Sequence, residues 1–275
     1  MRYYKGRTNL AATVFVPVKC GNNCPFCNTN HLYDGFVFSS EVMDRILNQI
    51  EICNRNDSVT EFVVTGGEPL FDLNVLNTLV SRMSKPVYIN TTLPLLKNID
   101  ECIDFINRSS KVEGVNISRH INLEHRVGTA GLEYIDRIEK PVRINCLVDE
   151  SMLGKELLDY IDLYAGPYRM VNLRADYRRI TTDTLKNRDA VSQWLLENFK
   201  FEMSNNCLVC NSEFYSDERY KVICYHRGLE NSSVTVGDRC YVNDVIIDIN
   251  GNVFKDWDMV EDKDFNAALG SGILL

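Results

Sequence analysis

The sequence predicts an α/β protein built on a parallel β-sheet. Short apolar segments alternate along the chain with longer segments whose apolar residues recur at helical spacing. The alternation repeats six times, and successive strand–helix units of this kind form a parallel sheet with right-handed crossovers. We therefore expect a sheet that either curves into a barrel or stays open.

The first two strand–helix units have clear boundaries. Residues 10–18 are an apolar run that predicts the first strand, and Ser40, with Glu41 in the first turn, is expected to open a helix. Residues 61–64 predict the second strand, and Asp72 is a suitable N-cap for the helix that follows. The two helices would bury Val42, Ile46, Leu47 and Ile50 in the first case, and Val75, Leu76, Leu79 and Val80 in the second.

The later elements follow the same pattern. Further strands are predicted at residues 86–90, 115–118, 142–148 and 169–174, with helices near residues 99–106, 132–138 and 153–164. A last helix over residues 183–199 would bury Val191, Trp194, Leu195 and Phe199.

The C-terminal part of the chain has a different pattern. Two β-hairpins are predicted, at residues 214–224 and at residues 245–254, the second turning at Asn250-Gly251. We therefore predict a main domain over residues 1–200 and a small, hairpin-rich, metal-binding domain over residues 201–275. A polar domain of this size needs a staple, and metal is a common one.

Composition limits the classes of partner and compartment. The net charge of −8 and pI near 5.1 argue against broad attraction to nucleic acid, although a local basic groove would still allow it as a partner. The ten cysteines, clustered in a chain of 275 residues, favour metal binding in the reducing cytoplasm over a disulfide framework. No run approaches the ~20 apolar residues of a membrane helix, so we expect no membrane partner.

Three cysteines follow the first predicted strand at once, with the spacing Cys-x3-Cys-x2-Cys. They are Cys20, Cys24 and Cys27. Closely spaced thiolates select soft metals, so zinc or an iron–sulfur cluster is expected. Three ligands also leave a fourth position open, where a substrate or cofactor can bind.

These residues resemble a known superfamily. Cys20, Cys24, Phe26 and Cys27 match the cluster motif of the radical S-adenosylmethionine (SAM) enzymes. Gly66-Gly67-Glu68-Pro69, which follows the second strand, is similar to the segment that receives the SAM amino group in that family. The resemblance covers about residues 8–180 and implies a partial (β/α)6 TIM-like barrel. It also implies a [4Fe-4S] cluster that binds SAM, cleaves it reductively and gives a 5′-deoxyadenosyl radical, which takes hydrogen from a substrate.

The resemblance implies roles for single residues. Gly66 and Gly67 lack Cβ atoms, so their backbone can approach the SAM ammonium closely. Glu68 would lie beside that positive charge, and Pro69 would stiffen the turn. The remaining cofactor contacts are expected from polar residues at the ends of the third and fourth strands, namely Asn90, Asn116 and Ser118. No catalytic side chain is predicted beyond the residues that hold the cluster and SAM.

A second cysteine group lies in the C-terminal part. Cys207 and Cys210 are followed by Cys224 after thirteen residues, and by Cys240 farther on. This order resembles the auxiliary-cluster domain called twitch, which implies a second [4Fe-4S] cluster. A tetrathiolate zinc site is the alternative, since Cys-x2-Cys pairs on hairpins are typical of zinc ribbons.

Three functional hypotheses follow. The first is a radical SAM enzyme that acts on a peptide, a protein or a small molecule, with an electron donor such as flavodoxin or ferredoxin. The second is a radical SAM enzyme that modifies a nucleoside, a nucleotide or a nucleic-acid base. The third is a non-catalytic iron–sulfur or zinc protein. The sequence leaves the substrate unassigned.

Overall fold

The chain divides into two compact units. The structure is a computed structural model that describes residues 1–6, 9–22, 24–27, 29–121, 123, 126–175, 182–205, 211–219, 221–228 and 233–272. Unit 1 comprises Met1–Val115, His125–Lys140 and Asn231–Leu275, and unit 2 comprises Asn116–Glu124 and Pro141–Glu230. Strand β5 (Val112–Ser118) runs across the division between them.

Unit 1 is built on a mostly parallel sheet with the strand order β14-β13-β2-β3-β4. The three parallel strands from the N-terminal half are β2 (Leu10–Val16), β3 (Val59–Gly66) and β4 (Val87–Thr91). The two strands on the other side of β2 are β13 (Asp244–Ile247), which is parallel to it, and β14 (Val253–Phe254), which forms a hairpin with β13. All seven residues of β2 are buried, as expected for an inner parallel strand.

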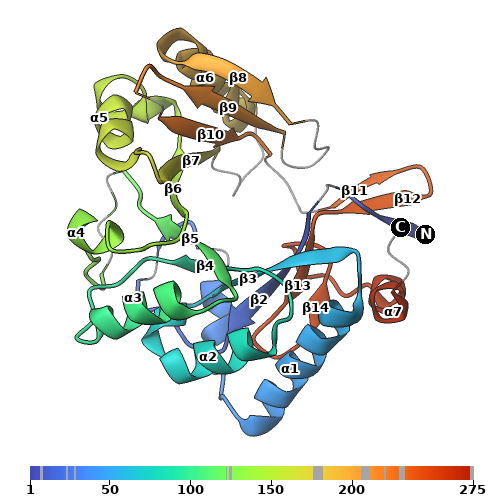
Figure 1. Ribbon diagram of the computed structural model, residues 1–275. Helices are drawn as coiled ribbons and strands as arrows, with labels where there is room; N and C mark the ends of the chain where they lie inside the picture. The colour runs from blue at the N-terminus through green and yellow to red at the C-terminus, as the bar shows by residue number, and fades with distance from the viewer. Residues whose placement is uncertain are drawn as a thin grey trace. The chain divides into compact units, whose positions relative to one another are not determined.

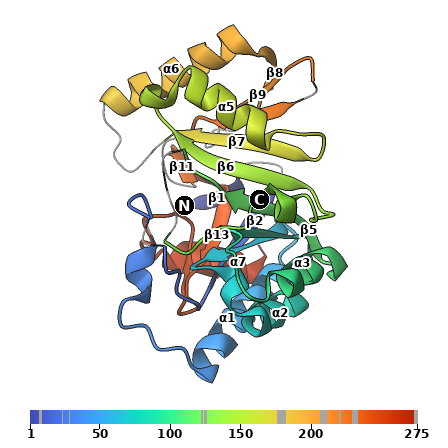
Figure 2. The same ribbon diagram turned by 90° about the vertical axis from the view of Figure 1, so that its left-hand side faces the viewer.

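Three helices cover this sheet. The helices α1 (Ser40–Arg55), α2 (Leu73–Arg82) and α3 (Ile99–Arg108) lie along one face of the strands (Figure 1 and Figure 2). The Asp72 carboxylate caps α2 as predicted and accepts from the amides of Asn74 and Val75 at 3.0 Å each. Helix α1 begins at Ser40 as predicted, and the Ser39 hydroxyl before it caps the helix by accepting from the Val42 amide.

The remaining elements of unit 1 are small. A three-stranded sheet has the order β1-β12-β11, formed by β1 (Arg2–Lys5), β12 (Arg239–Val242) and β11 (Ser233–Val236). Two further helices are α4 (Leu132–Ile135) and α7 (Lys263–Ser271), and two 3-10 turns are η1 (Asn30–Tyr33) and η2 (Pro69–Phe71). A buried cluster of Phe15, Tyr33, Ile246, Ile249 and Phe254 joins the end of β2, the turn η1 and the C-terminal hairpin.

Unit 2 has the strand order β6-β7-β10-β9-β8. Its strands are β6 (Val142–Val148), β7 (Arg169–Ala175), β10 (Val222–His226), β9 (Ser212–Ser216) and β8 (Lys200–Ser204). The first three are parallel to one another, and β9 pairs antiparallel with both β10 and β8. Figure 2 shows α5 (Lys155–Tyr164) and α6 (Thr182–Asn198) on one side of this sheet, and the 3-10 turn η3 (Glu150–Met152) precedes α5.

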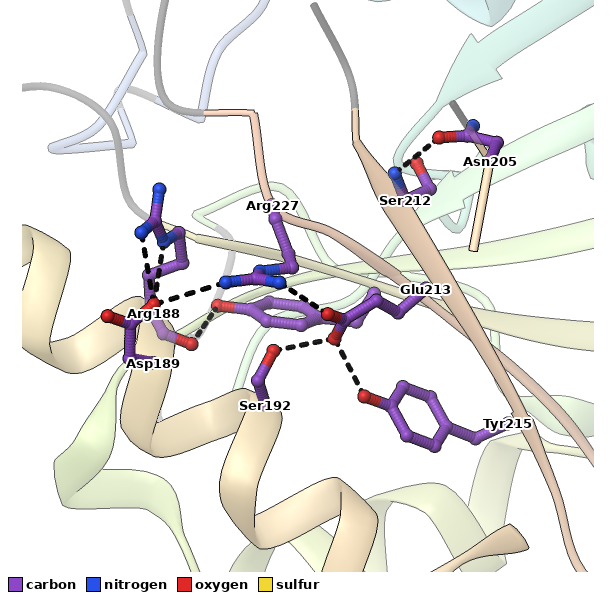
Figure 3. A network of polar contacts seen from close by, with 9 residues as sticks. Arg188, Asp189, Ser192, Asn205, Ser212, Glu213, Tyr215 and Arg227 are labelled. Carbon is purple, nitrogen blue, oxygen red and sulfur yellow. Dashed lines mark hydrogen bonds and ion pairs between the residues drawn. The ribbon is translucent and has the colours of Figure 1, made fainter. Parts of the chain in front are cut away.

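A buried carboxylate connects α6 to the β9–β10 hairpin (Figure 3). Glu213 accepts from Ser192 Oγ at 2.6 Å, from the Tyr215 hydroxyl at 2.7 Å and from Arg227 Nη1 at 2.5 Å. Arg227 also pairs with the exposed Asp189 of α6 at 3.2 Å. A charge in this position is tolerated because its oxygens are occupied by donors and its charge is balanced.

The predicted α/β class with a mostly parallel sheet is confirmed, and curvature into a partial (β/α)6 barrel remains a prediction. The described strands are ordered as open sheets and do not close into a barrel. The predicted boundary after residue 200 remains a prediction, and the two predicted C-terminal hairpins pair with different strands. Strand β13 pairs with β2, and β10 pairs with β7. No helix in the described part of the chain is long and apolar enough to cross a membrane.

Candidate cofactor site

The three predicted metal ligands lie together on the loop that follows β2. Cys20 and Cys24 are half-buried, and Cys27 is exposed. The Cys27 amide donates to the Cys24 carbonyl at 3.0 Å, so the second and third cysteines share one tight turn. Among the described residues, no three Cys, His, Asp or Glu side chains already converge as a metal-binding set.

The thiols affect one another electrostatically. Burial raises the pKa of Cys24 to about 11, and the neighbouring Cys20 and Cys27 add to this effect. Burial also raises the pKa of Cys20, although hydrogen bonding from Asn22 acts in the opposite direction. Several thiolates on one loop repel each other unless a cation balances them, and a bound metal deprotonates coordinating thiols outright. The donor set therefore suits a soft metal centre.

Asn22 fixes the cysteine loop to another segment of unit 1. Its side-chain oxygen accepts from the Val127 amide at 2.9 Å, and its own backbone N–H donates to the Cys20 sulfur at 3.5 Å. Asn22 is only 5% exposed, and its side-chain nitrogen has no hydrogen-bond partner among the described residues. The sequence prediction did not include Asn22, because an asparagine between two cysteines carries no signal of burial.

The glycine turn lies directly against the start of the cysteine loop. A Cβ atom on Gly67 would lie 1.7 Å from the Val18 carbonyl oxygen and 2.9 Å from the Cys20 backbone nitrogen. Only a residue without a side chain fits between these groups. Gly66 has a φ of +103°, a left-handed conformation that favours glycine. The structure thus brings Gly67 to the cysteine loop and Gly66 to Val16 at the end of β2, and their contact with SAM remains a prediction.

Tyr33 joins the same two segments through its hydroxyl. It donates to the Val16 carbonyl oxygen at 2.9 Å and accepts from the Gly67 amide at 2.5 Å. The side chain is 5% exposed and packs in the buried cluster around Phe15. Burial raises the pKa of Tyr33 well above its ordinary value, so the hydroxyl keeps its proton for donation. Tyr33 was not predicted from the sequence.

Glu68 connects the glycine turn to the end of β4. Its carboxylate accepts from the Leu70 amide, from the Thr91 hydroxyl, and from both the amide and the hydroxyl of Thr92, at 2.5–3.2 Å. Glu68 is fully buried. Burial raises its pKa, while these hydrogen bonds act to lower it. Four donors of the chain hold the Glu68 oxygens. In the structure, Glu68 therefore positions the glycine turn against the end of β4.

The other predicted cofactor residues of unit 1 lie near these groups. Pro69 is buried and opens the turn η2 directly after Glu68. Asn90, on β4, donates from its side-chain nitrogen to the Thr65 hydroxyl on β3 at 3.3 Å. Phe26 is half-buried in the turn before Cys27. Their contacts with a cofactor remain predictions.

Asn116 and Ser118 belong to unit 2. They are two residues apart on β5 and half-buried, with the buried Ile117 between them, so they share one face of the strand. In the same unit, Asn172 donates to the Asn145 side-chain oxygen at 2.6 Å. The roles of Asn116 and Ser118 toward SAM remain predictions.

The second cysteine group is described only in part. Cys207 and Cys210 lie outside the described residues. Cys224 is buried on β10 in unit 2, and burial raises its pKa to about 11. Cys240 is buried on β12 in unit 1. A shared metal site for these four cysteines remains a prediction, and Cys53, Cys102 and Cys146 are buried.

The cysteine loop meets two structural requirements for a cluster that binds SAM. It presents three thiols beside the buried Asn22 side-chain nitrogen, which has no acceptor among the described residues, and it adjoins the space next to Gly67 that a Cβ atom would fill. Soft thiolates suit iron, and a turn of two glycines without side chains lets backbone atoms approach an ammonium group. The residues present therefore fit such a group.

Comparisons with known proteins give only distant similarities. No protein-family model matches the chain, and no curated protein is significantly similar to it in sequence. Among solved structures, native anSMEcpe with bound AdoMet has 14% identity and a TM-score of 0.47, over 68% of this chain and 61% of that one. Streptococcus suis SuiB bound to S-adenosylmethionine has 17% identity and a TM-score of 0.49, over 69% of this chain and 48% of that one. A radical SAM methyltransferase from Sphaerobacter thermophilus has 14% identity and a TM-score of 0.45, over 68% of this chain and 63% of that one.

The chain spans between about half and three fifths of the length of these proteins. Identities below one fifth and TM-scores below 0.5 assign no activity to it. The function proposed below therefore depends on the chain's own residues.

Proposed function

We propose that the chain is a radical SAM enzyme, in which Cys20, Cys24 and Cys27 hold a [4Fe-4S] cluster. The observation that supports this most directly is the close approach of the glycine turn to the cysteine loop. The Glu68 amide donates to the Val18 carbonyl at 3.4 Å, and Gly67 leaves no room for a side chain beside Cys20. Two motifs that are separated by about forty residues in the sequence thus form one site.

Different residues of the chain would hold the cluster, bind SAM and position the glycine turn. The three thiolates would hold the iron, and the backbone of the 66–67 turn would receive the SAM ammonium. When bound, the cluster and SAM supply a 5′-deoxyadenosyl radical that takes a hydrogen atom from the substrate. Tyr33 and Glu68 would keep the turn in place, because each connects it to the end of a neighbouring strand.

The experiment uses anaerobically reconstituted full-length protein. With SAM and a strong reductant, the wild type should form 5′-deoxyadenosine, and single alanine variants of Cys20, Cys24 and Cys27 should not. Cys53→Ala is the matched control, because Cys53 is fully buried on α1 and should leave iron content unchanged. Reductive SAM cleavage by the three ligand variants at the wild-type rate would refute the proposal, and failure of the wild type to form 5′-deoxyadenosine would favour the non-catalytic alternative.

The substrate is proposed only by class. A peptide, protein or small molecule remains our first hypothesis, and a nucleoside, nucleotide or nucleic-acid base is the alternative. Either would need an electron donor such as flavodoxin or ferredoxin. Binding of labelled nucleotides and of candidate peptides to the reconstituted protein separates the two.

We also propose that Cys207, Cys210, Cys224 and Cys240 hold a second metal. The iron and zinc contents of the wild type and of a Cys207→Ala, Cys210→Ala variant identify it. About eight irons per chain, falling to about four in the variant, indicate a second [4Fe-4S] cluster. About four irons with one zinc that the variant loses indicate the zinc alternative. Equal metal contents in the two proteins would refute a second site.

A further inference from the structure

The Asn22 side chain carries a buried amide donor that makes no hydrogen bond of normal geometry with the described residues. Asn22 is 5% exposed, and its Nδ2 atom has no hydrogen-bond partner among the described residues. Burying a polar group without a partner destabilises the fold, and such groups in folded proteins nearly always have a partner. An acceptor is therefore expected at this position in the functioning protein.

The orientation of this amide is set by its neighbour. Oδ1 accepts from the Val127 backbone amide at 2.9 Å. A backbone N–H can only donate, so the side chain cannot be turned over to place its nitrogen there. The side-chain oxygen of Asn22 therefore lies toward Val127, and the side-chain nitrogen, which carries the donor hydrogens, takes the other position of the amide group.

The surroundings identify the acceptor by its chemistry. Asn22 lies two residues from both Cys20 and Cys24, and its backbone N–H already points to the Cys20 sulfur at 3.5 Å. The atoms that the proposed cluster would add beside this loop are sulfur atoms, which accept N–H hydrogen bonds. Hydrogen bonds to these sulfurs help to set the reduction potential of an iron–sulfur cluster, because they stabilise the more negative reduced state.

We propose that the Asn22 side-chain amide donates to a sulfur of the cluster site and raises the reduction potential of the cluster. This inference rests on the proposed function. Asn22 acts through the cluster and does not touch the reacting atoms, so it is a positioning and tuning residue. Its link to Val127 keeps the donor in place.

The test measures the midpoint potential by a redox titration followed by electron paramagnetic resonance. Asn22→Leu removes the donor without adding charge. Asn22→Asp also removes the donor but keeps an acceptor for the Val127 amide. Both variants should keep the iron content of the wild type and have a more negative midpoint potential, with the larger shift in Asn22→Asp because its charge adds to the effect.

Asn266→Leu is the matched control. Asn266 lies on α7, and its side-chain oxygen is likewise buried without a partner among the described residues. The same substitution there should affect stability and leave the potential unchanged.

The outcomes separate this inference from the proposed function. If the wild type takes up no iron and cleaves no SAM, the proposed function fails, and this inference fails with it. If the wild type forms the cluster and both Asn22 variants keep its potential, only the inference is wrong. Loss of the cluster from both Asn22 variants would also overturn it, since a tuning donor is not needed to hold iron.

Discussion

Tyr33 and Gly67 are joined by a hydrogen bond of 2.5 Å, in which the Gly67 amide donates to the tyrosine hydroxyl. The same hydroxyl donates to the Val16 carbonyl at 2.9 Å, at the last residue of β2. One buried side chain therefore holds the glycine turn against the strand that leads into the cysteine loop.

Replacing Tyr33 with phenylalanine should loosen this turn without disturbing the packing of the ring. The Gly67 amide and the Val16 carbonyl would lose their partner, so unfolding should become easier by about 1–3 kcal/mol in urea titrations. SAM binding to the reconstituted protein should weaken severalfold, because the turn that receives the ammonium is less fixed. Tyr168→Phe is the control, since Tyr168 is 87% exposed. Equal stability and equal SAM affinity in Tyr33→Phe and the control would show that the hydroxyl has no positioning role.

An alanine at position 67 should be poorly tolerated. Its Cβ atom would lie 1.7 Å from the Val18 carbonyl oxygen, so the backbone of the turn or of the cysteine loop must move. We expect a loss of about 3 kcal/mol or more in urea unfolding. Gly128→Ala is the comparison, because nothing lies within 4 Å of its added Cβ atom and its stability should change by less than about 0.5 kcal/mol. A Gly67→Ala protein as stable as Gly128→Ala would contradict the close contact of Gly67 with Val18 and Cys20.

Asp262 should make stability depend on pH in acid. Its carboxylate accepts from the Phe265 amide and the Tyr3 hydroxyl at 3.0 and 2.9 Å, and it pairs with Lys255. Burial acts to raise the pKa of Asp262, but these partners outweigh it, and the pKa lies below its ordinary value. A lowered pKa means that the stabilisation is complete above the ordinary value of about 4 and is lost as the pH falls through the lowered value.

Asp262→Asn tests this sign. The variant keeps a helix cap but loses the charge, so it should be less stable than the wild type by about 1–2 kcal/mol at pH 7. Urea unfolding of both proteins between pH 7 and pH 3 should show this difference shrinking below about pH 4. The other acidic groups titrate in both proteins and cancel in the difference. If the difference in unfolding free energy between the wild type and Asp262→Asn stays constant or widens in acid, Asp262 is not the group responsible for the pH dependence.

Glu213 should be a major contributor to the stability of unit 2. Glu213→Gln leaves Arg227 without its buried counter-charge, which we expect to cost about 3 kcal/mol. The exposed Asp189 also pairs with Arg227, and Asp189→Asn should cost less than about 1 kcal/mol. The chain has two tryptophans, and in a Trp257→Phe background the fluorescence of Trp194 on α6 reports unfolding of unit 2 alone. Equal destabilisation by the two substitutions would place the important charge at Asp189 instead.

The sequence predicted most elements because local patterns decide them. Strand β6 occupies the predicted residues 142–148, and Asp72 caps α2 as expected. Helix α4 is shorter than predicted and ends at Ile135. The strands β1 and β12 were not predicted, since four-residue strands with mixed polarity have no clear periodicity.

The candidate site was predicted by motif and only partly by contact. Cys20 and Gly67 belong to motifs with a recognisable spacing, and the structure brings these two residues together. Tyr33 and Asn22 were missed, because their importance comes from hydrogen bonds to backbone groups that are distant in sequence or belong to other segments. No pattern of residue types shows where those backbone groups will lie.

The sequence by itself determined the fold class, the cysteine loop and the glycine turn, because periodicity and ligand spacing are local properties of the chain. Only the tertiary structure decided that β13 of one C-terminal hairpin pairs with β2 and β10 of the other with β7, and that Glu68 is held by Thr91 and Thr92. Strand pairing and carboxylate burial depend on which distant segments supply hydrogen-bond partners, and that is settled only when the chain folds.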